Sequence, residues 1–444
     1  MNNLVIQAPV PAPAAPSPAP APPITCWIGL DWADQKHCLV VRTAPTAPPK
    51  THLVEHTPAA LDAWFSQLRL EHPTGRIAVA LEQSRGAVLY GLLKYDFLAL
   101  YPVNPRCLAD YRRAFNVSGA KDDPRDADLI GELVILHADR LRALVVEDEP
   151  TRQLRLLVEA RRTFVEERSA WSNRLGATLK CYYPLALELV GEDLATPLAL
   201  DFLRRWPNLA QLQAAKPATV RSFCYAHHSR SEEKITARLA AIVAARPLTE
   251  DAALLVPLQL QTQHLVQQLR TLNRAVADYD TQIQRGFAHH SEAWLFGPLP
   301  GAGPALAPRV AAVFGTVRAN FAATNDGLCF TGVAPVKKES GHLKVVQFRY
   351  ARPLFVHQSI VEFAKCSIGQ CDWARLLYED QMRKKKNRWA AIRGVAFKWL
   401  RILWRCWQDR QPYDEARYLR SLQRDGVVLY QSLYADLAPA KTPV

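Results

Sequence analysis

The sequence predicts a mixed α/β domain near the N-terminus, followed by a long and mainly helical remainder. Three observations support this prediction. Short apolar runs alternate with helical patterns up to about residue 145. Strand patterns then disappear between about residues 150 and 288, where leucines recur at helical spacing. After Trp294, apolar helical segments alternate with turns.

The α/β domain is expected to cover residues 24–145. Before it lies a segment rich in proline and alanine, 1–23, which has little to bury and is expected to be a disordered tail. Expected strands are 25–32, 37–42, 51–54, 76–81 and 97–103, and expected helices are 59–70, 86–94 and a segment from Asp123 to about Ala138. Asp123 is the expected N-cap, because Pro124 suits the first helical position.

The helical middle is expected to span 146–290. Two long leucine-rich runs, 154–179 and 254–283, predict an antiparallel hairpin or coiled coil, with a compact helical insert at 206–247. The segment 186–250 has no feature that indicates a function. A C-terminal domain is expected at 291–425, where a glycine turn at 300–303 leads into an apolar helix at 305–314, and a tail at 426–444.

Charge indicates the class of partner. The 444 residues include 55 Lys and Arg against 42 Asp and Glu, a formal net charge of +13, which favours a polyanion such as nucleic acid. No apolar run of about 18 residues is present, so no membrane-spanning helix is expected. Nine scattered cysteines and the lack of an evident signal peptide are typical of a cytoplasmic protein with reduced thiols.

Four acids stand where predicted strands or helices end or begin: Asp31, Glu82, Asp123 and Asp126. This order matches an RNase H-like (RuvC-like) fold, on which they would converge and bind Mg²⁺ or Mn²⁺ through hard oxygen ligands. Such ions assist phosphoryl chemistry on nucleic acid. The simpler alternatives are that Asp123 only caps a helix and that Glu82 is merely solvated. Asp122, Asp128 and Asp34 are neighbours that could be mistaken for ligands, and Asp128 is expected at the helix surface.

Basic residues gather in the C-terminal part. A segment at 381–410 holds ten cations against one acid and is expected to be a helix with a basic, phosphate-binding face. Its apolar stripe is expected to comprise Trp389, Ile392, Ala396, Trp399, Leu403 and Cys406, with Trp404 and Trp407 near the edge and able to stack on bases. The predicted nucleic-acid-binding residues are Lys337, Lys338, Arg349, Arg352, Arg393, Lys398, Arg401 and Arg405.

Two further segments have ambiguous roles. The turn Pro300-Gly301-Ala302-Gly303 resembles a helix-hairpin-helix element, so it is either a structural turn or a phosphate contact. Ser340-Gly341, in a basic loop, is by its residue types a turn rather than a nucleophile.

In this order, the motifs resemble the insertion-sequence "one-ten" family of transposases, the bridge-RNA-guided DEDD recombinases. The resemblance spans roughly 25–420. Its residues are Gly29-Leu30-Asp31, Glu82, Lys121-Asp122-Asp123 with Asp126-Ala127, Leu299-Pro300-Gly301-Ala302-Gly303, Gly332-Val333-Ala334-Pro335, Ser340-Gly341 and Pro412-Tyr413-Asp414. Two positions depart from the family. Asp122 stands where a Thr is frequent, and Arg349-Tyr350-Ala351-Arg352-Pro353 replaces a stretch like Lys/Arg-Gly-Asn.

The resemblance implies a RuvC-like domain, a coiled-coil linker and a C-terminal transposase domain. It implies that Asp31, Glu82, Asp123 and Asp126 bind divalent metal, and that Ser340 attacks DNA to form a phosphoserine link. Asp122 stays an alternative to Asp123. The implied partners are donor and target DNA, a structured non-coding guide RNA and further copies of the chain, as a dimer or tetramer, in the bacterial cytoplasm near the nucleoid.

Two other functions remain open from the sequence. A RuvC-like metal-dependent nuclease or junction resolvase would hydrolyse DNA with water and leave Ser340 structural. A non-catalytic RNA- or DNA-binding protein would keep the fold and the basic surface without needing the acids.

Overall fold

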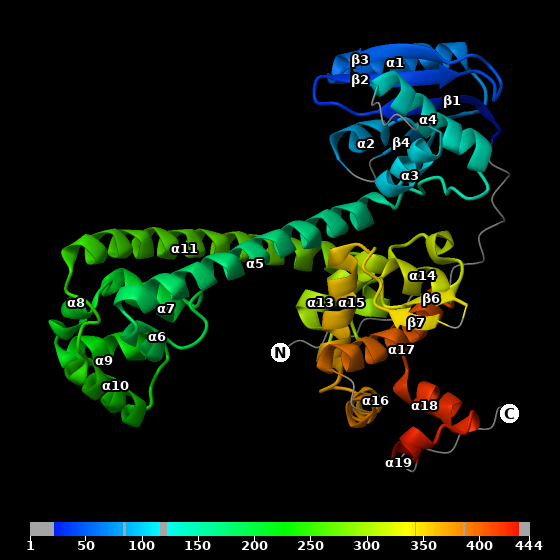
Figure 1. Ribbon diagram of the computed structural model, residues 1–444. Coiled ribbons are helices and arrows are strands. Elements are labelled where there is room, and N and C mark those ends of the chain that lie inside the picture. The colour runs from blue at the N-terminus through cyan, green and yellow to red at the C-terminus, as the bar shows by residue number, and fades with distance from the viewer. Residues whose placement is uncertain (1–21, 83–85, 116–121, 342, 385–386, 435–444) are drawn as a thin grey trace. The chain divides into compact units, whose positions relative to one another are not determined.

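A computed structural model describes residues 22–82, 86–115, 122–341, 343–384 and 387–434 (Figure 1). The expected tail at 1–23 therefore lies almost wholly outside the described residues. By its contacts the chain divides into two compact units, Met1–Val146 and Glu147–Val444. Among the helices of the described ranges, none is both long enough and apolar enough to cross a membrane.

The N-terminal unit contains a five-stranded mixed sheet in the order β3-β2-β1-β4-β5. β1 pairs antiparallel with β2 and parallel with β4, β2 pairs antiparallel with β3, and β4 pairs parallel with β5. The strands are β1 (Ile24–Asp31), β2 (Lys36–Arg42), β3 (Lys50–Glu55), β4 (Arg76–Leu81) and β5 (Leu98–Pro102). All five predicted strands form, with ends shifted by one residue at most places.

Helices cover both faces of this sheet. α1 (Pro58–Glu71) and α2 (Ala87–Leu92) pack with the face that carries Ile28 and Leu30. α3 (Pro105–Phe115) and α4 (Asp123–His137) cover the face that carries Ala78 and Ala80. Small alanines on this second face let the helices approach closely. The mixed sheet and its helices are compatible with the predicted RNase H-like domain (Figure 1).

In the second unit, α5 (Glu149–Tyr182) and α11 (Ala252–Ala288) form a long helical hairpin, called the arm below (Figure 1). Arg161 bonds Asp280, Arg168 bonds Asn273, and Tyr182 bonds Thr262. As the residue number increases along α5, the number of its partner on α11 decreases, so the two helices are antiparallel. The predicted hairpin is confirmed.

Five short helices connect the two long ones: α6 (Leu185–Val190), α7 (Pro197–Arg205), α8 (Leu209–Gln213), α9 (Pro217–Ala226) and α10 (Glu232–Ala244). The insert thus begins at Leu185, and the expected start at residue 206 was wrong. Residues such as Ala199 and Leu200 belong to its core, which also includes Leu265 and Leu269 of α11. The insert is therefore packed onto the arm.

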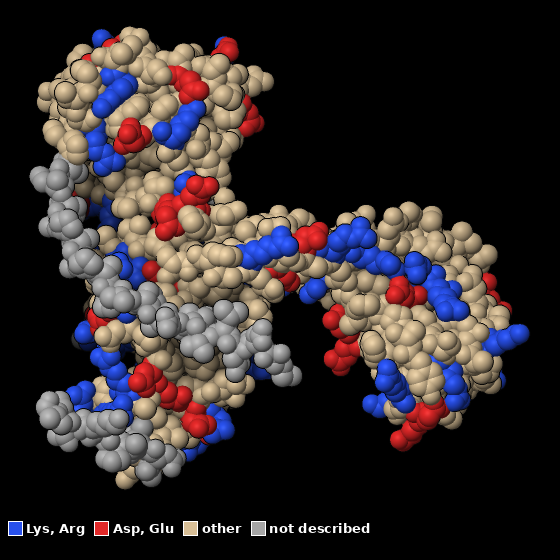
Figure 2. All heavy atoms as spheres, turned by 180° about the vertical axis from the view of Figure 1, so that it is seen from behind, with Lys and Arg blue, Asp and Glu red and all other residues tan. Residues whose placement is uncertain are grey.

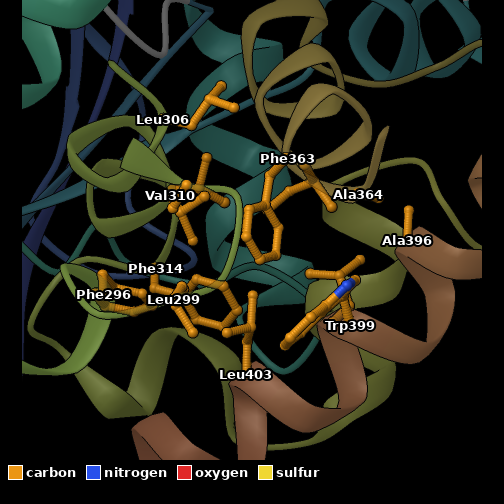
Figure 3. Packing of buried hydrophobic residues seen from close by; sticks show 14 of the residues in the cluster. Phe296, Leu299, Leu306, Val310, Phe314, Phe363, Ala364, Ala396, Trp399 and Leu403 are labelled. Atoms are coloured by element: carbon orange, nitrogen blue, oxygen red, sulfur yellow. The ribbon is translucent and has the colours of Figure 1, made fainter. Parts of the chain in front are cut away.

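The rest of the second unit is a helical bundle with one β-hairpin. Its helices are α12 (Ala293–Phe296), α13 (Gly303–Phe314), α14 (Thr324–Phe330), α15 (Leu354–Ser367), α16 (Asp372–Arg383), α17 (Arg388–Gln408), α18 (Glu415–Arg424), α19 (Gln431–Tyr434) and the 3₁₀ turns Arg318–Phe321 and Val428–Tyr430. β6 (Val336–Ser340) and β7 (Leu343–Gln347) form the hairpin. α13, α15 and α17 meet in an apolar core around Phe314, Phe363 and Trp399 (Figure 3).

The predicted continuous helix over 381–410 was wrong. α16 ends at Arg383 and α17 starts at Arg388, where Asn387 is the N-cap and its side chain accepts a hydrogen bond from the Ala390 amide. A capping asparagine satisfies an amide that would otherwise lack a partner, so it favours a fresh helix start. The basic segment is consequently divided between two helices.

Candidate catalytic and nucleic-acid-binding sites

Asp31 and Glu82 lie at one edge of the N-terminal sheet. Leu30 of β1 is register-paired with Leu81 of the parallel neighbour β4. Asp31 ends β1, and Glu82 directly follows β4. Because the strands are parallel and in register, the two acids leave the sheet at the same edge. Both are half-buried.

Helix α4 is held unusually close to β1. A Cβ at Gly29 would lie 1.7 Å from the backbone oxygen of Ala127, and one at Gly131 would lie 3.0 Å from the Gly29 nitrogen. Only glycine at position 29 permits this contact. The close approach packs the helix that carries Asp123 and Asp126 directly on the strand that carries Asp31.

The first acids of α4 lie in the neighbourhood of Asp31. Cys38 of β2 pairs with Asp31 in the sheet. Its thiol pKa is raised to about 11, first by burial and then by the charges of Asp31, Asp123 and Asp122. All three carboxylates therefore lie within electrostatic range of one thiol.

The N-cap of α4 is Asp122, and the expectation that it would be Asp123 was wrong. Asp122 has extended backbone angles of φ −143° and ψ 126°, and its side chain makes no capping hydrogen bond. Asp123 is the first helical residue, and Pro124 follows it. Proline is tolerated there because the first amides of a helix have no intrahelical partner. Both side chains are exposed, so neither is committed to capping the helix.

Asp126 has a different environment. It is only 3% exposed, and its Oδ1 lies 2.8 Å from Nε of Arg112 on α3. The contact is an ion pair without the alignment of a hydrogen bond. Sequence reasoning missed both α3 and this arginine, although 105–115 has an amphipathic pattern. Asp128, expected at the surface, is instead partly buried and pairs with Arg42 at 2.7 Å.

These acids offer the oxygen ligands that Mg²⁺ and Mn²⁺ prefer. Asp31, Glu82 and Asp123 fit this donor chemistry, while Asp126 would exchange Arg112 for a cation. Throughout the described part of the chain, no group of three or more His, Cys, Asp or Glu residues is close enough to hold an ion. Carboxylates repel one another when no cation or proton lies between them.

Ser340 lies at the end of the β6–β7 hairpin. It is the last residue of β6, pairs with Leu343 across the hairpin, and is exposed. Gly341 follows with φ +55°, a left-handed conformation that suits glycine, and His342 lies outside the described residues. Ser340 is therefore exposed on a strand, directly before the turn of a hairpin, whereas a loop was expected from the sequence.

Comparison with known proteins shows a transposase domain in the N-terminal part of the chain. Residues 28–184 match the DEDD transposase domain of the IS110 family, described as a transposase. The chain carries an IS110-family transposase domain. The family predicted from the resemblance is confirmed, and the protein is a DNA transposase. The matched range contains Asp31, Glu82, Asp123 and Asp126, and it ends well before Ser340.

Two relatives align with this transposase over most of its length. It is 26% identical over 412 residues to the "Mini-circle putative transposase for IS117" of Streptomyces coelicolor, covering 89% of this chain and 96% of the relative. It is 24% identical over 400 residues to the "Insertion element IS900 uncharacterized 42 kDa protein" of Mycobacterium paratuberculosis, covering 88% and 97%. The similarity therefore includes the arm and the C-terminal bundle as well as the matched domain.

The predicted basic residues of the transposase fall into two groups. Lys337 and Lys338 are exposed on β6, and Arg349 and Arg352 follow β7. Arg352 shares the ring of Phe348 with Arg393 of α17. The second group lines a cavity of about 650 Å³ between α17 and α18, together with Trp404 and Tyr413, and comprises Lys398, Arg401 and Arg405. Lys and Arg residues also gather along the arm, which adds a further basic surface (Figure 2).

The predicted positions of two tryptophans, Trp407 and Trp389, require correction. Trp407, expected at the edge, is fully buried and donates its indole N–H to the Gly315 carbonyl at 2.9 Å. Trp389, expected in the core, is 53% exposed. Trp404 is half-buried and donates to Phe321. The face of α17 that packs on the bundle therefore differs between its two ends. As a result, Trp389 is exposed and Trp407 is buried.

The glycine turn of the transposase has a structural role. Gly301 has φ +79°, and a Cβ there would lie 2.8 Å from the backbone of Cys366 at the end of α15. The turn thus brings α13 against α15 within the bundle core. This packing accounts for the glycine without a phosphate contact.

Proposed function

We propose that this transposase cuts and rejoins DNA through a covalent phosphoserine on Ser340, assisted by divalent metal at Asp31, Glu82, Asp123 and Asp126. The main support is the register of β1 and β4, which brings Asp31 and Glu82 to one sheet edge beside the acids of α4. The exposed position of Ser340 at a hairpin end supports its role as nucleophile.

A bound Mg²⁺ or Mn²⁺ would stabilise negative charge on the phosphate oxygens during strand exchange. Asp31 and Glu82 hold fixed positions because β1 and β4 lie inside the sheet. Asp123 comes from the exposed first turn of α4, which lets it adjust to the ion. In the metal-free protein Arg112 neutralises Asp126. Asp126 would release this arginine in order to bind the metal.

The serine step conserves the energy of the broken bond. The hydroxyl oxygen of Ser340 forms a bond to phosphorus while one bond from phosphorus to a deoxyribose oxygen breaks. The serine proton ends on the released sugar hydroxyl. Attack by a sugar hydroxyl of another strand reverses these changes and frees the serine. No water or nucleotide triphosphate is consumed, in contrast to hydrolysis by a nuclease.

We further propose that a structured non-coding RNA pairs with donor and target DNA, and that the protein works as a dimer or tetramer. The Lys and Arg residues along the arm, in addition to those of the C-terminal bundle, support binding of more than one nucleic-acid strand (Figure 2). Cleavage that requires the RNA transcribed from the element's flank, and that is lost after ribonuclease treatment, would support the proposal. RNA-independent cleavage would contradict it.

The serine chemistry is tested by trapping the protein–DNA adduct on denaturing gels. Wild type is expected to form an adduct, and Ser340→Ala is expected to form none and to lose strand cleavage. Cleavage by Ser340→Ala at the wild-type rate would instead identify a hydrolytic nuclease.

The role of the acids is tested with a matched pair of variants in one domain. Asp31→Asn should abolish cleavage while leaving DNA binding largely intact. Asp34→Asn removes the same charge from an exposed turn and should leave cleavage unchanged. If every activity survived Asp31→Asn, the protein would be a non-catalytic nucleic-acid-binding protein.

A further inference from the structure

Two arginines stack on one aromatic ring beside the serine hairpin, and a third lies near them. The guanidinium carbons of Arg352 and Arg393 lie 4.2 Å and 4.7 Å from the ring centre of Phe348. Nη1 of Arg352 donates to the backbone carbonyl of Arg349 at 2.7 Å. The Arg349 side chain donates to the Ala334 carbonyl, two residues from the Gly332 against which Arg352 packs. Arg349, Arg352 and Arg393 are called the arginine cluster below. Guanidinium groups stay charged, so the cluster concentrates three positive charges.

Nothing among the described residues neutralises this charge. The cluster forms no ion pair with a described carboxylate, and its hydrogen-bond partners are backbone carbonyls and the Cys329 thiol. Nε of Arg352 is buried and has no hydrogen-bond partner. Burial and the charge of Arg352 lower the pKa of Arg393. An unneutralised and partly desolvated cluster of like charges is costly unless an anion binds to it.

The segment before β6 positions the arginines of the cluster. Gly332 has φ +68°, and a Cβ there would lie 2.1 Å from Cδ of Arg352, so only glycine leaves room for this side chain. The Ala334 carbonyl accepts a hydrogen bond from Nε of Arg349 at 3.1 Å. The segment Gly332-Val333-Ala334-Pro335 therefore contacts and positions two of the three arginines, Arg349 and Arg352.

The ring beneath the arginines is held as well. Phe348 contacts the edge of His357, with ring centres 5.6 Å apart. His357 is buried and its Nδ1 bonds the Thr331 carbonyl. Burial, together with Arg352 and Arg393, lowers the pKa of His357, so it adds no fourth charge at neutral pH. The cluster is therefore positioned before any ligand arrives.

The cluster lies at the opposite end of the β6–β7 hairpin from Ser340. Residues 332–335 directly precede β6, and residues 348–352 directly follow β7, so the cluster lies at the base of the hairpin that ends in Ser340. A strand of five residues spans roughly 17 Å at about 3.4 Å per residue. Base steps repeat at about 3.4 Å along a strand, so this length equals roughly five nucleotides.

We propose that the arginine cluster is a preformed binding site for one phosphodiester of a nucleic-acid backbone. Arginine matches this ligand because its planar fork donates two parallel hydrogen bonds to phosphate. The inference deepens the proposed function and rests on it for the relation to the cut. If the backbone is that of the DNA substrate, the bound phosphate lies roughly five nucleotides from the bond that Ser340 attacks.

Inorganic phosphate provides the first test. The thermal unfolding midpoint of the full chain is measured in phosphate and in chloride at equal ionic strength. Phosphate should raise the midpoint of wild type, because a ligand of the folded state stabilises it. The increase should shrink in Arg393→Gln and persist in Lys365→Gln, a control that removes one exposed charge from the same bundle. Equal increases in both variants would overturn the proposal.

The second test measures binding rather than cleavage, so it is independent of the serine chemistry. Each phosphate contact contributes about 0.9 to the slope of log affinity against log salt for duplex DNA. Arg393→Gln should reduce the slope by roughly that amount, whereas Lys365→Gln should not. Phe348→Leu retains every charge but removes the stacking face, so it should also weaken binding.

Duplex DNA and structured RNA are titrated separately. A reduced slope with duplex DNA assigns the phosphate to the substrate, and a reduced slope with RNA alone assigns it to the guide. Unchanged slopes with both would refute the site. A cluster that passes these tests would stand even if Ser340→Ala retained cleavage.

Discussion

At the scale of single residues, glycines decide how closely the functional elements approach one another. Gly29 lets α4 lie against β1 beside Asp31, and Gly332 lets the side chain of Arg352 cross the segment before the serine hairpin. In both places the space that a Cβ would need is already occupied. A larger side chain at Gly29 would therefore displace the helix that carries the acids, and one at Gly332 would displace Arg352 directly.

Gly29→Ala is expected to destabilise the N-terminal domain, since its Cβ would overlap the Ala127 carbonyl. Overpacking of this kind typically costs about 1–3 kcal/mol. Gly91→Ala is the matched control, because nothing lies within 4 Å of a Cβ at that helical position. Chemical denaturation should show a loss for the first variant and a neutral or slightly stabilising change for the second. Equal stability of the two would refute the close-packing argument.

His290 is expected to make stability dependent on pH. It is buried, its Nε2 bonds Thr151 Oγ1 and its Nδ1 accepts from the Glu292 amide, an arrangement that suits the neutral ring. Burial lowers its pKa in the folded state, although Asp148, Glu292 and Glu147 act in the opposite direction. The unfolded chain therefore binds this proton first, at a pH near 6.5. Stability is full above that pH and declines as the pH falls towards the lower folded pKa.

The measurement is the unfolding midpoint at pH 7.5 and pH 5.5. The loss on acidification should be smaller in His290→Gln than in wild type. His289→Gln replaces the exposed neighbour and should keep the wild-type loss. An unchanged loss in His290→Gln would mean that other groups cause the acid sensitivity.

At the scale of elements, buried hydrogen bonds stabilise the arm where its two helices contact the insert. The Tyr182 hydroxyl of α5 donates to the Pro207 carbonyl at 2.7 Å and bonds the Thr262 hydroxyl of α11 at 3.0 Å. All three groups are buried in the core shared by α5, α11 and the insert. One side chain thus links three parts of the chain, and the ion pair between Arg161 and Asp280 links the helices further along.

Tyr182→Phe should lower the unfolding midpoint, because it leaves a buried carbonyl without its donor. Such a loss costs about 1–3 kcal/mol. Thr262→Val should cost less, near 1 kcal/mol, since Tyr182 still reaches Pro207. The effects of the two variants should not add when combined. Thr281→Val, whose hydroxyl bonds only its own helix, is the control and should be close to neutral.

At the scale of the whole molecule, the positive charge is spread over many elements. The net charge is +13. Exposed basic residues lie on the hairpin and on α17, and others lie along the arm (Figure 2). This distribution suits a protein that binds long nucleic acids over many phosphates. Because these cations are exposed to solvent, salt screens their attraction to nucleic acid.

Affinity for DNA is therefore expected to fall steeply with salt. A protein that contacts six to ten phosphates loses roughly 10³- to 10⁵-fold between 50 and 200 mM salt. Binding by Ser340→Ala, which is expected not to cleave, allows equilibrium measurement by fluorescence anisotropy. A change of less than roughly tenfold over this range would argue against an electrostatic surface of this size.

Local patterns in the sequence were enough to predict the strands, the long hairpin and the residues at the strand ends. These features are local: an apolar run followed by Asp31 or Glu82 defines both the strand and the acid that ends it. The leucine spacing likewise defines α5 and α11. The family of the chain followed from such motifs in their order.

Only the tertiary structure decided which of these residues meet. It paired Asp126 with Arg112, buried Trp407 while exposing Trp389, and brought Arg352 and Arg393 onto the ring of Phe348. Periodicity shows that a helix has an apolar face, but the neighbouring helices determine how far that face is covered. Contacts between residues distant in sequence depend on packing and charge in three dimensions, and no local pattern encodes them.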